Sequence, residues 1–299
     1  MTSAPALVLA ERRAPAVSAS AHRGWRRFRS HRPALLGAAV LAVLGLLAAL
    51  APWLAPHPPG AIDLGDVVAP PGPAHLLGTD ELGRDVLSRV LFGGRVSLLV
   101  GVCSMAIAIA IGALYGSVAG LRGGRLDAVL MRGVDFALSF PTIFVLLIVV
   151  SLSRVSTGSI ALYIGLTGWM GIARLVRSQV LSLREREFVV ALRSLGAGTW
   201  RIVALHLIPN AAGPVIVAGT LGVGGAMLVE AALDFLGLGV APDTPTWGNL
   251  LSGAELYVTS QPWLAVIPGL LITLTVVSFS LLGDGLRDAL DPYSESGPS

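Results

Sequence analysis

The stretch that decides the fold runs from residue 96 to residue 121, VSLLVGVCSMAIAIAIGALYGSVAGL, and it contains no charged residue. A second uncharged stretch covers residues 35–50. A helix needs about 20 apolar residues to cross about 30 Å of hydrocarbon. The 299-residue chain is 54% hydrophobic and 13% charged, and its mean hydropathy is +0.76. These values predict an all-α, polytopic membrane protein.

The apolar runs predict six transmembrane helices. The third and fourth runs are divided only weakly, by Arg154 and the serines of residues 151–159, so a single re-entrant hairpin is the alternative there. The first run is longer than the apolar region of a signal peptide, so we expect it to remain as a membrane span. The six predicted ranges are 34–54, 96–121, 134–153, 159–175, 211–236 and 262–282.

The placement of the arginines predicts the orientation of the chain. All 21 basic residues are arginine. If the N-terminus is cytoplasmic, only Arg84, Arg89, Arg95 and Arg154 lie outside, and the opposite orientation would invert this bias. We therefore expect both termini in the cytoplasm.

The lack of lysine and the single cysteine exclude several kinds of site from this chain. A Walker-type phosphate loop requires a lysine, and the chain has none, so we expect ATP to bind to another chain. A Schiff base on lysine is excluded for the same reason. Cys103 is the single cysteine, which excludes an intramolecular disulfide and a zinc site built from several cysteines.

Small residues recur every four positions in two of the predicted spans. Ala108, Gly112, Gly116 and Gly120 fall on one helix face, and residues 218, 222 and 226 (Ala, Gly, Ala) fall on another. Faces of this kind allow helices to approach closely in a membrane. They predict tight packing but do not separate a transporter from a receptor.

Several acidic residues lie in or near predicted spans. Glu230 and Asp234 share a helix face, and they either line a translocation path or are solvated at the membrane surface. Asp135 is expected to pair with Arg132 at the cytoplasmic edge.

The segment from 174 to 210, RLVRSQVLSLREREFVVALRSLGAGTWRIVALHLIPN, is a long arginine-rich connector on the predicted cytoplasmic side. Phe188, Leu192 and Leu195 recur at helical spacing. Glycines at 196 and 198 break that helix, and a second short helix is expected from about residue 200 to residue 207, before Pro209. Such a pair of helices fits a groove on another protein, or alternatively lies on the lipid surface.

This connector resembles the cytoplasmic signature of type I ABC-importer permeases. The family pattern is Glu-Ala-Ala, three residues, Gly, nine residues, Ile, one residue, Leu-Pro. Ala191, Gly196 and Pro209 match it. The departures are Val for the Glu at 190, Leu for Ala at 192, His for Ile at 206 and Ile for Leu at 208. Glu187 lies one turn earlier and is a candidate substitute for the missing acid.

Further stretches resemble the second permease subunit of the peptide and nickel importers. They are HLLGTDELGRDVLSRVLFGGRVSLLVG (75–101), DFALSFPT (135–142), EAALDFLGLGVAPDTPTWGNL (230–250) and LGDGLRDALDP (282–292). The resemblance implies a MetI-like ABC permease fold with a cytoplasmic tail at 1–33. The first helix and an external segment follow over 34–95, then a core over 96–292 with a coupling loop at 176–210, and a C-terminal tail at 293–299.

The resemblance also implies the function. The chain is expected to be a non-enzymatic permease subunit of a peptide importer in the inner membrane of a bacterial cell. Its expected partners are a homologous permease, two ABC ATPase subunits, an extracytoplasmic solute-binding protein and membrane lipid, without nucleic acid. No catalytic, cofactor or metal residue is expected. The residues implied in ATPase coupling are Glu187, Ala191, Leu192, Arg193, Gly196, His206 and Pro209.

Two external stretches have their own interpretations. Asp80, Glu81 and Asp85 lie close to Arg84, which favours internal ion pairs or contact with a partner over a metal site. Residues 242–247 predict a rigid turn with an interfacial tryptophan, either packed or facing the binding protein.

Two other functions remain as alternatives to the importer permease. They are an ion-driven secondary transporter and a non-transporting receptor or scaffold.

Overall fold

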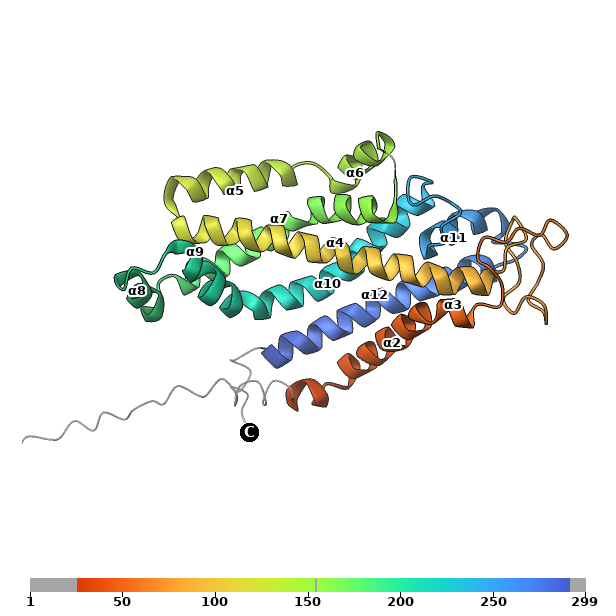
Figure 1. Cartoon of the computed structure of the whole chain (residues 1–299), viewed down its shortest axis with the longest axis horizontal. Helices are drawn as coiled ribbons and strands as arrows, with labels where there is room; N and C mark the ends of the chain where they lie inside the picture. Colours follow the sequence, from red (N-terminus) through yellow and green to blue (C-terminus); the bar gives the residue numbers. More distant parts are fainter. Residues whose placement is uncertain (1–25, 154, 291–299) are drawn as a thin grey trace, which may run out of the picture.

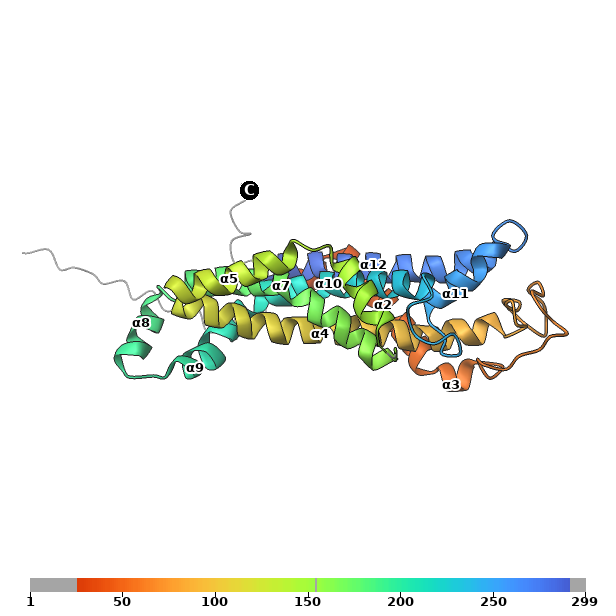
Figure 2. The same cartoon turned by 90° about the horizontal axis from the view of Figure 1, so that it is seen from above.

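The computed structural model describes residues 26–153 and 155–290. The predicted C-terminal tail and most of the predicted N-terminal tail lie outside these ranges. Within them the chain is a long helical bundle, and an isolated β-bridge joins Thr79 to Asp85 (Figure 1). The bundle is flatter in the view of Figure 2. In both views α8 and α9 lie at one end and the segment after α3 lies at the other.

Five of the described helices are long and apolar enough to cross a membrane. Four of them are longer than the predicted spans, because helices continue beyond the hydrocarbon into polar sequence, whereas the first is shorter than predicted and ends at Ala49. Their bounds are α2 (Arg32–Ala49), α4 (Val86–Arg122), α7 (Thr157–Leu183), α10 (Ile208–Phe235) and α12 (Trp263–Leu290).

Shorter elements connect these spans. They are α3 (Ala51–Leu54), α5 (Gly124–Leu138), α6 (Thr142–Ser151), α8 (Glu187–Ser194), α9 (Thr199–Ile202), the π-helix η1 (Val203–Leu207), α11 (Trp247–Ala254) and the 3₁₀ helix η2 (Glu255–Tyr257).

The predicted third span, 134–153, is not one straight helix. α5 and α6 are bent by 75° at a short break, so together they form a broken span or a re-entrant loop. Pro141 caps α6 in an extended conformation. A residue that precedes proline is disfavoured in a helix, which explains why α5 stops before it. The predicted fourth span is a separate and complete helix, α7.

The predicted end of the connector's second helix is also wrong. Instead of stopping before Pro209, the chain runs from α9 through η1 directly into α10. Pro209 lies in the first turn of α10, where the N–H that proline lacks requires no partner. The knob formed by α8 and α9 is therefore continuous with a membrane span.

The small residues of α4 pack against α7, as their spacing predicts. An added Cβ on Gly112 would lie 2.7 Å from the carbonyl oxygen of Trp169, and one on Gly120 would lie 2.9 Å from Cβ of Val180. On α10, Gly222 faces Met105 of α4, and Ala226 is buried. α10 also packs on α12, and α12 packs on α2, which completes the bundle.

Candidate functional site

The knob, defined here as α8, α9 and the corner between them (residues 187–202), projects from one end of the bundle (Figure 1). Gly196 adopts φ +77° at the corner, and the Ala197 N–H donates to the carbonyl of Leu192 at 3.0 Å. This hydrogen bond with a left-handed residue before it is the Schellman arrangement that ends many helices. The expected break at Gly196 is thus present, and glycine adopts the left-handed conformation without steric cost.

Apolar side chains anchor the knob to the bundle. Val189 is fully buried, and Ile202 and Leu207 are buried beside it in the main core cluster. At its base, Arg184 donates to the carbonyl of Gly120 at the end of α4 (3.1 Å). Of the three apolar residues at helical spacing, Phe188 and Leu195 are exposed and Leu192 is half-buried.

An exposed apolar surface remains on the knob and on the turn after it. Phe188 is 39% exposed, Val190 54%, Leu195 84% and Leu205 60%. Val190, at the position of the acid in the family pattern, therefore faces outward. The residues that were predicted to couple to the ATPases differ in exposure. Glu187, Ala191, Gly196 and Pro209 are exposed, Leu192 and His206 are half-buried, and Arg193 lies on α8.

The ion pairs around Asp135 differ from the expected one. Asp135 pairs with Arg174 of α7 at 2.5 Å rather than with Arg132. A second pair joins the same two helices: Arg177 contacts both carboxylate oxygens of Asp127, at 2.5 and 2.6 Å. These contacts join residues 39 and 50 positions apart, so helical spacing along one element could not reveal them.

Glu230 and Asp234 lie at the far end of α10 from the knob. They are 1% and 2% exposed, so neither is solvated at a surface within this chain. Glu230 accepts a hydrogen bond from Ser97 of α4 at 3.1 Å. Asp234 accepts from the Val240 N–H at 2.8 Å and from the Thr246 hydroxyl. The two carboxylates thus fasten α4 and α11 to α10, and their role in lining a path stays a prediction.

The acidic stretch at the opposite end forms internal ion pairs, as expected. Arg84 contacts Asp80 at 2.7 Å and Glu81 at 2.8 Å, and Arg89 contacts Asp80 at 3.3 Å. Both arginines also donate to the carbonyl of Pro242. They therefore tie the start of α4 to the loop before α11.

Trp247 is not interfacial. It is 2% exposed, and its ring N–H donates to the carbonyl of Val90 at 3.0 Å. Residues 245–247 of this turn are buried, whereas Pro242 and Asp243 are exposed, so contact of the turn with a binding protein stays a prediction.

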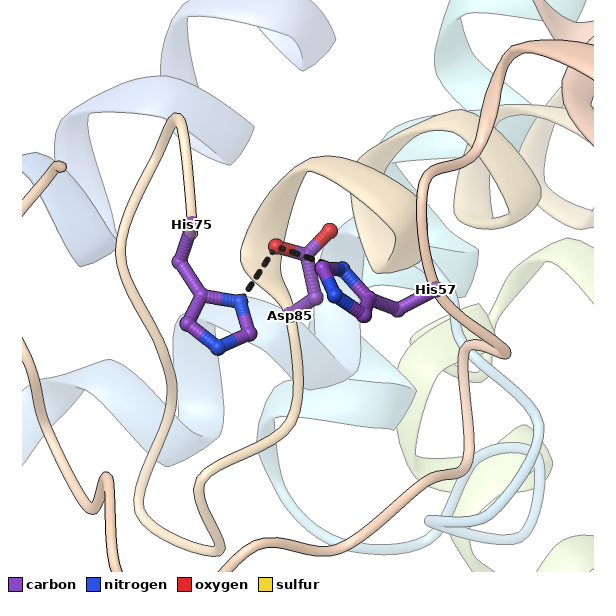
Figure 3. Close-up of side chains that lie close together, drawn as sticks. All are labelled: His57, His75 and Asp85. Atoms are coloured by element: carbon purple, nitrogen blue, oxygen red, sulfur yellow. Dashed lines mark hydrogen bonds and ion pairs between the residues drawn. The ribbon is translucent and has the colours of Figure 1, made fainter. Parts of the chain in front are cut away.

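Asp85 has different partners from its acidic neighbours. It caps α4 by accepting from the backbone and hydroxyl of Ser88, and it contacts His75 at 2.9 Å and His57 at 3.7 Å (Figure 3). Burial raises the pKa of its carboxyl, but the hydrogen bonds from Ser88 and His75 and the charge of His57 outweigh burial and hold the pKa below its ordinary value. Sequence reasoning missed the two histidines, since they lie in irregular segments without periodicity.

The helical bundle and its membrane-length helices define the class of polytopic helical membrane proteins. Residues 112–294 match the family model described as binding-protein-dependent transport system inner membrane component. Residues 21–71 match the N-terminal TM domain of oligopeptide transport permease C. The chain belongs to the family of binding-protein-dependent transport system inner membrane components.

Similar proteins cover almost the whole chain. The dipeptide transport system permease protein DppC of Bacillus subtilis is 40% identical over 90% of this chain and 84% of that protein. The oligopeptide permease OppC of the same organism is 37% identical over 89% and 87%. The probable D,D-dipeptide permease DdpC of Escherichia coli is 41% identical over 87% and 88%. The resemblance noted from the motifs is confirmed.

Proposed function

We propose that this chain is one permease subunit of an ATP-driven importer for peptides or peptide-like solutes. A homologous permease would complete the translocation path, two ATPase subunits would bind the ATP, and an external binding protein would deliver the solute. The observation that carries the proposal is the knob, whose exposed apolar side chains lie at one end of a membrane bundle. Relatives named as dipeptide and oligopeptide permeases support the solute class.

The knob is suited to receive motion from another subunit because both of its ends are rigid. α7 leads into it, and α9 continues through η1 into α10 without an extended break. Val189 and Leu207 fix it to the core. Closure of an ATPase dimer against the exposed face would then rotate α7 and α10 as units, which is what alternating access requires.

The sidedness of this arrangement follows from the arginines. The knob and its flanks are rich in arginine, which favours the cytoplasm, where ATPases reside. The opposite end, with the segment after α3, would then face the binding protein. The chain contains no lysine for a Walker loop, which agrees with ATP binding on separate subunits.

Gly196 provides the test. A side chain here meets no atom within 4 Å, so Gly196→Trp would project from the knob into the docking partner. We expect Gly196→Trp in the complete importer to keep ATP hydrolysis but to lower solute uptake per ATP at least about tenfold, because the indole would hold the partner away from the knob.

Gly196→Ala is the matched control, because it imposes the same left-handed strain without the bulk. Uptake and ATPase activity are measured together in proteoliposomes. Docking through the knob predicts that the Ala variant stays coupled. If Gly196→Trp transported as much solute per ATP as the wild-type protein, docking through the knob would be contradicted.

A further inference from the structure

A compact group of metal-ligand side chains lies at the end of the bundle opposite the knob. His57 follows α3, His75 lies in the long segment before α4, and Asp85 caps α4. Their ligand atoms all lie within 4.8 Å of one another. Figure 3 shows the two imidazole rings on either side of the Asp85 carboxylate. None of these residues belongs to the coupling surface.

The spacing is close to that of a zinc site. With bonds of about 2.0–2.1 Å in a tetrahedron, ligand atoms lie roughly 3.3 Å apart. Nδ1 of His75 is 2.9 Å from Oδ1 of Asp85, and Nδ1 of His57 is 3.7 Å from the same oxygen. Small rotations of the two rings, whose centroids are 4.8 Å apart, would bring the three atoms to that spacing.

A second observation points to a ligand. Nδ1 of His57 is buried and has no hydrogen-bond partner, although it faces a carboxylate. Buried polar atoms are nearly always paired, so an orphaned one requires an explanation. A cation between this nitrogen and Oδ1 of Asp85 would satisfy both atoms.

Hydrogen bonds from Ser88 orient the Asp85 carboxylate toward the two histidines. Oδ2 of Asp85 accepts from the Ser88 N–H at 2.8 Å and the Ser88 hydroxyl at 2.7 Å, which turns Oδ1 toward the histidines. The same hydroxyl accepts from the backbone N–H of His57 at 3.2 Å. Outer contacts of this kind orient the ligands of metal sites.

The charge balance of the described residues agrees with a cation. Arg84 and Arg89 pair with Asp80 and leave Asp85 without an arginine, so its described ion-pair partners are the two histidines. The Asp85 side chain is fully buried, whereas that of His57 is 41% exposed. An ion can therefore enter from the side of His57, where the fourth coordination position would remain open.

We propose that His57, His75 and Asp85 form a binding site for a borderline divalent transition-metal ion such as Zn²⁺. Two imidazole nitrogens and one carboxylate oxygen favour such ions over Mg²⁺ or Ca²⁺, which prefer oxygen alone. The bound ion would join the exit of α3 to the start of α4 and so clamp the intervening segment. This role is independent of the proposed transport function, because it concerns the stability of one end of the bundle.

The test uses the complete importer, purified through a tag without histidine and treated with EDTA. Zn²⁺ or Mg²⁺ is then added, and the midpoint of thermal unfolding and the bound zinc per chain are measured. A ligand that binds only the folded state at about 100 times its Kd should raise the unfolding midpoint of a single chain of this length by about 4 °C, and that of a complex of several chains by less. We expect this shift with Zn²⁺ and not with Mg²⁺.

His57→Gln is the diagnostic variant. Because Nδ1 of His57 makes no hydrogen bond and its ion pair with Asp85 is long, at 3.7 Å, the EDTA-treated variant should unfold close to the wild-type midpoint, yet it should lose the zinc shift and one bound zinc per chain. His31→Gln is the matched control, since His31 caps α2 away from the cluster, and it should keep the full zinc response. A wild-type protein without a zinc shift, or a His57→Gln variant with an undiminished one, would overturn the proposal.

Discussion

At the residue scale, the contact between α4 and α7 depends on the absence of side chains. Gly116 lies against the carbonyl oxygen of Ala173, and an added Cβ would overlap that backbone atom. Backbone cannot rotate away as a flexible side chain can. Gly116 is therefore required by the approach of two helices and not by its own conformation, because it lies within a regular helix.

We expect Gly116→Ala to destabilise the importer by about 1–3 kcal/mol, the usual cost of overpacking. Gly171→Ala on α7 is the control, because an added Cβ there meets no atom within 4 Å. It should be neutral or slightly stabilising, since alanine favours helices. Thermal unfolding of both variants in detergent measures the difference. Equal midpoints would show that the α4–α7 contact is looser than described.

At the scale of the element, α5 is joined to α7 by two ion pairs that differ in geometry and in exposure to solvent. Arg177 and Asp127 form a bidentate, partly buried ion pair, in which two N–H groups donate to the two carboxylate oxygens. The side chains of Arg174 and Asp135 are 50% and 60% exposed. Bidentate pairs are stronger, and exposed pairs are weakened by solvent. The first pair should therefore fix α5 beside α7.

Two double-mutant cycles, with alanine at each position, test this difference. We expect a coupling free energy of about 1–3 kcal/mol for Asp127 with Arg177 and less than about 1 kcal/mol for Asp135 with Arg174. Unfolding midpoints of the single and double variants supply the values. A larger coupling for the exposed pair would refute this ranking.

The helices could be predicted from the sequence better than the connections and contacts between them. Apolar runs predicted the spans, and four-residue spacing predicted the face that meets α7, because both are local properties of a helix. The continuation through Pro209 was missed because a π turn places the proline in a permissive position. The partner of Asp135 and the cluster around Asp85 were missed because they join segments that only the fold brings together.

At the scale of the whole molecule, the knob and the segment before α12 should lie on opposite sides of the membrane. Cys103 is exposed and is the chain's single cysteine, so Cys103→Ser gives a background for labelling. Ala191→Cys and Ser260→Cys each place one thiol at an exposed position.

With an impermeant maleimide, we expect Ser260→Cys to react in intact cells and Ala191→Cys to react only in inverted vesicles. ATPase subunits bound to the knob should protect Ala191→Cys and leave Ser260→Cys unaffected. Labelling of both positions from one side would contradict the orientation. Equal labelling of Ala191→Cys with and without the ATPases would contradict docking on this face.

The π turn at Val203–Leu207 also matters to anyone who builds hybrid importers. A π turn holds one residue more than an α turn, and one residue corresponds to about 100° around a helix axis. A transplanted knob that lacked this residue would keep every span in place yet present its apolar side chains in a different direction. Exchanges between relatives should therefore transfer residues 187–207 together, so that the knob keeps its orientation around the axis of the following helix.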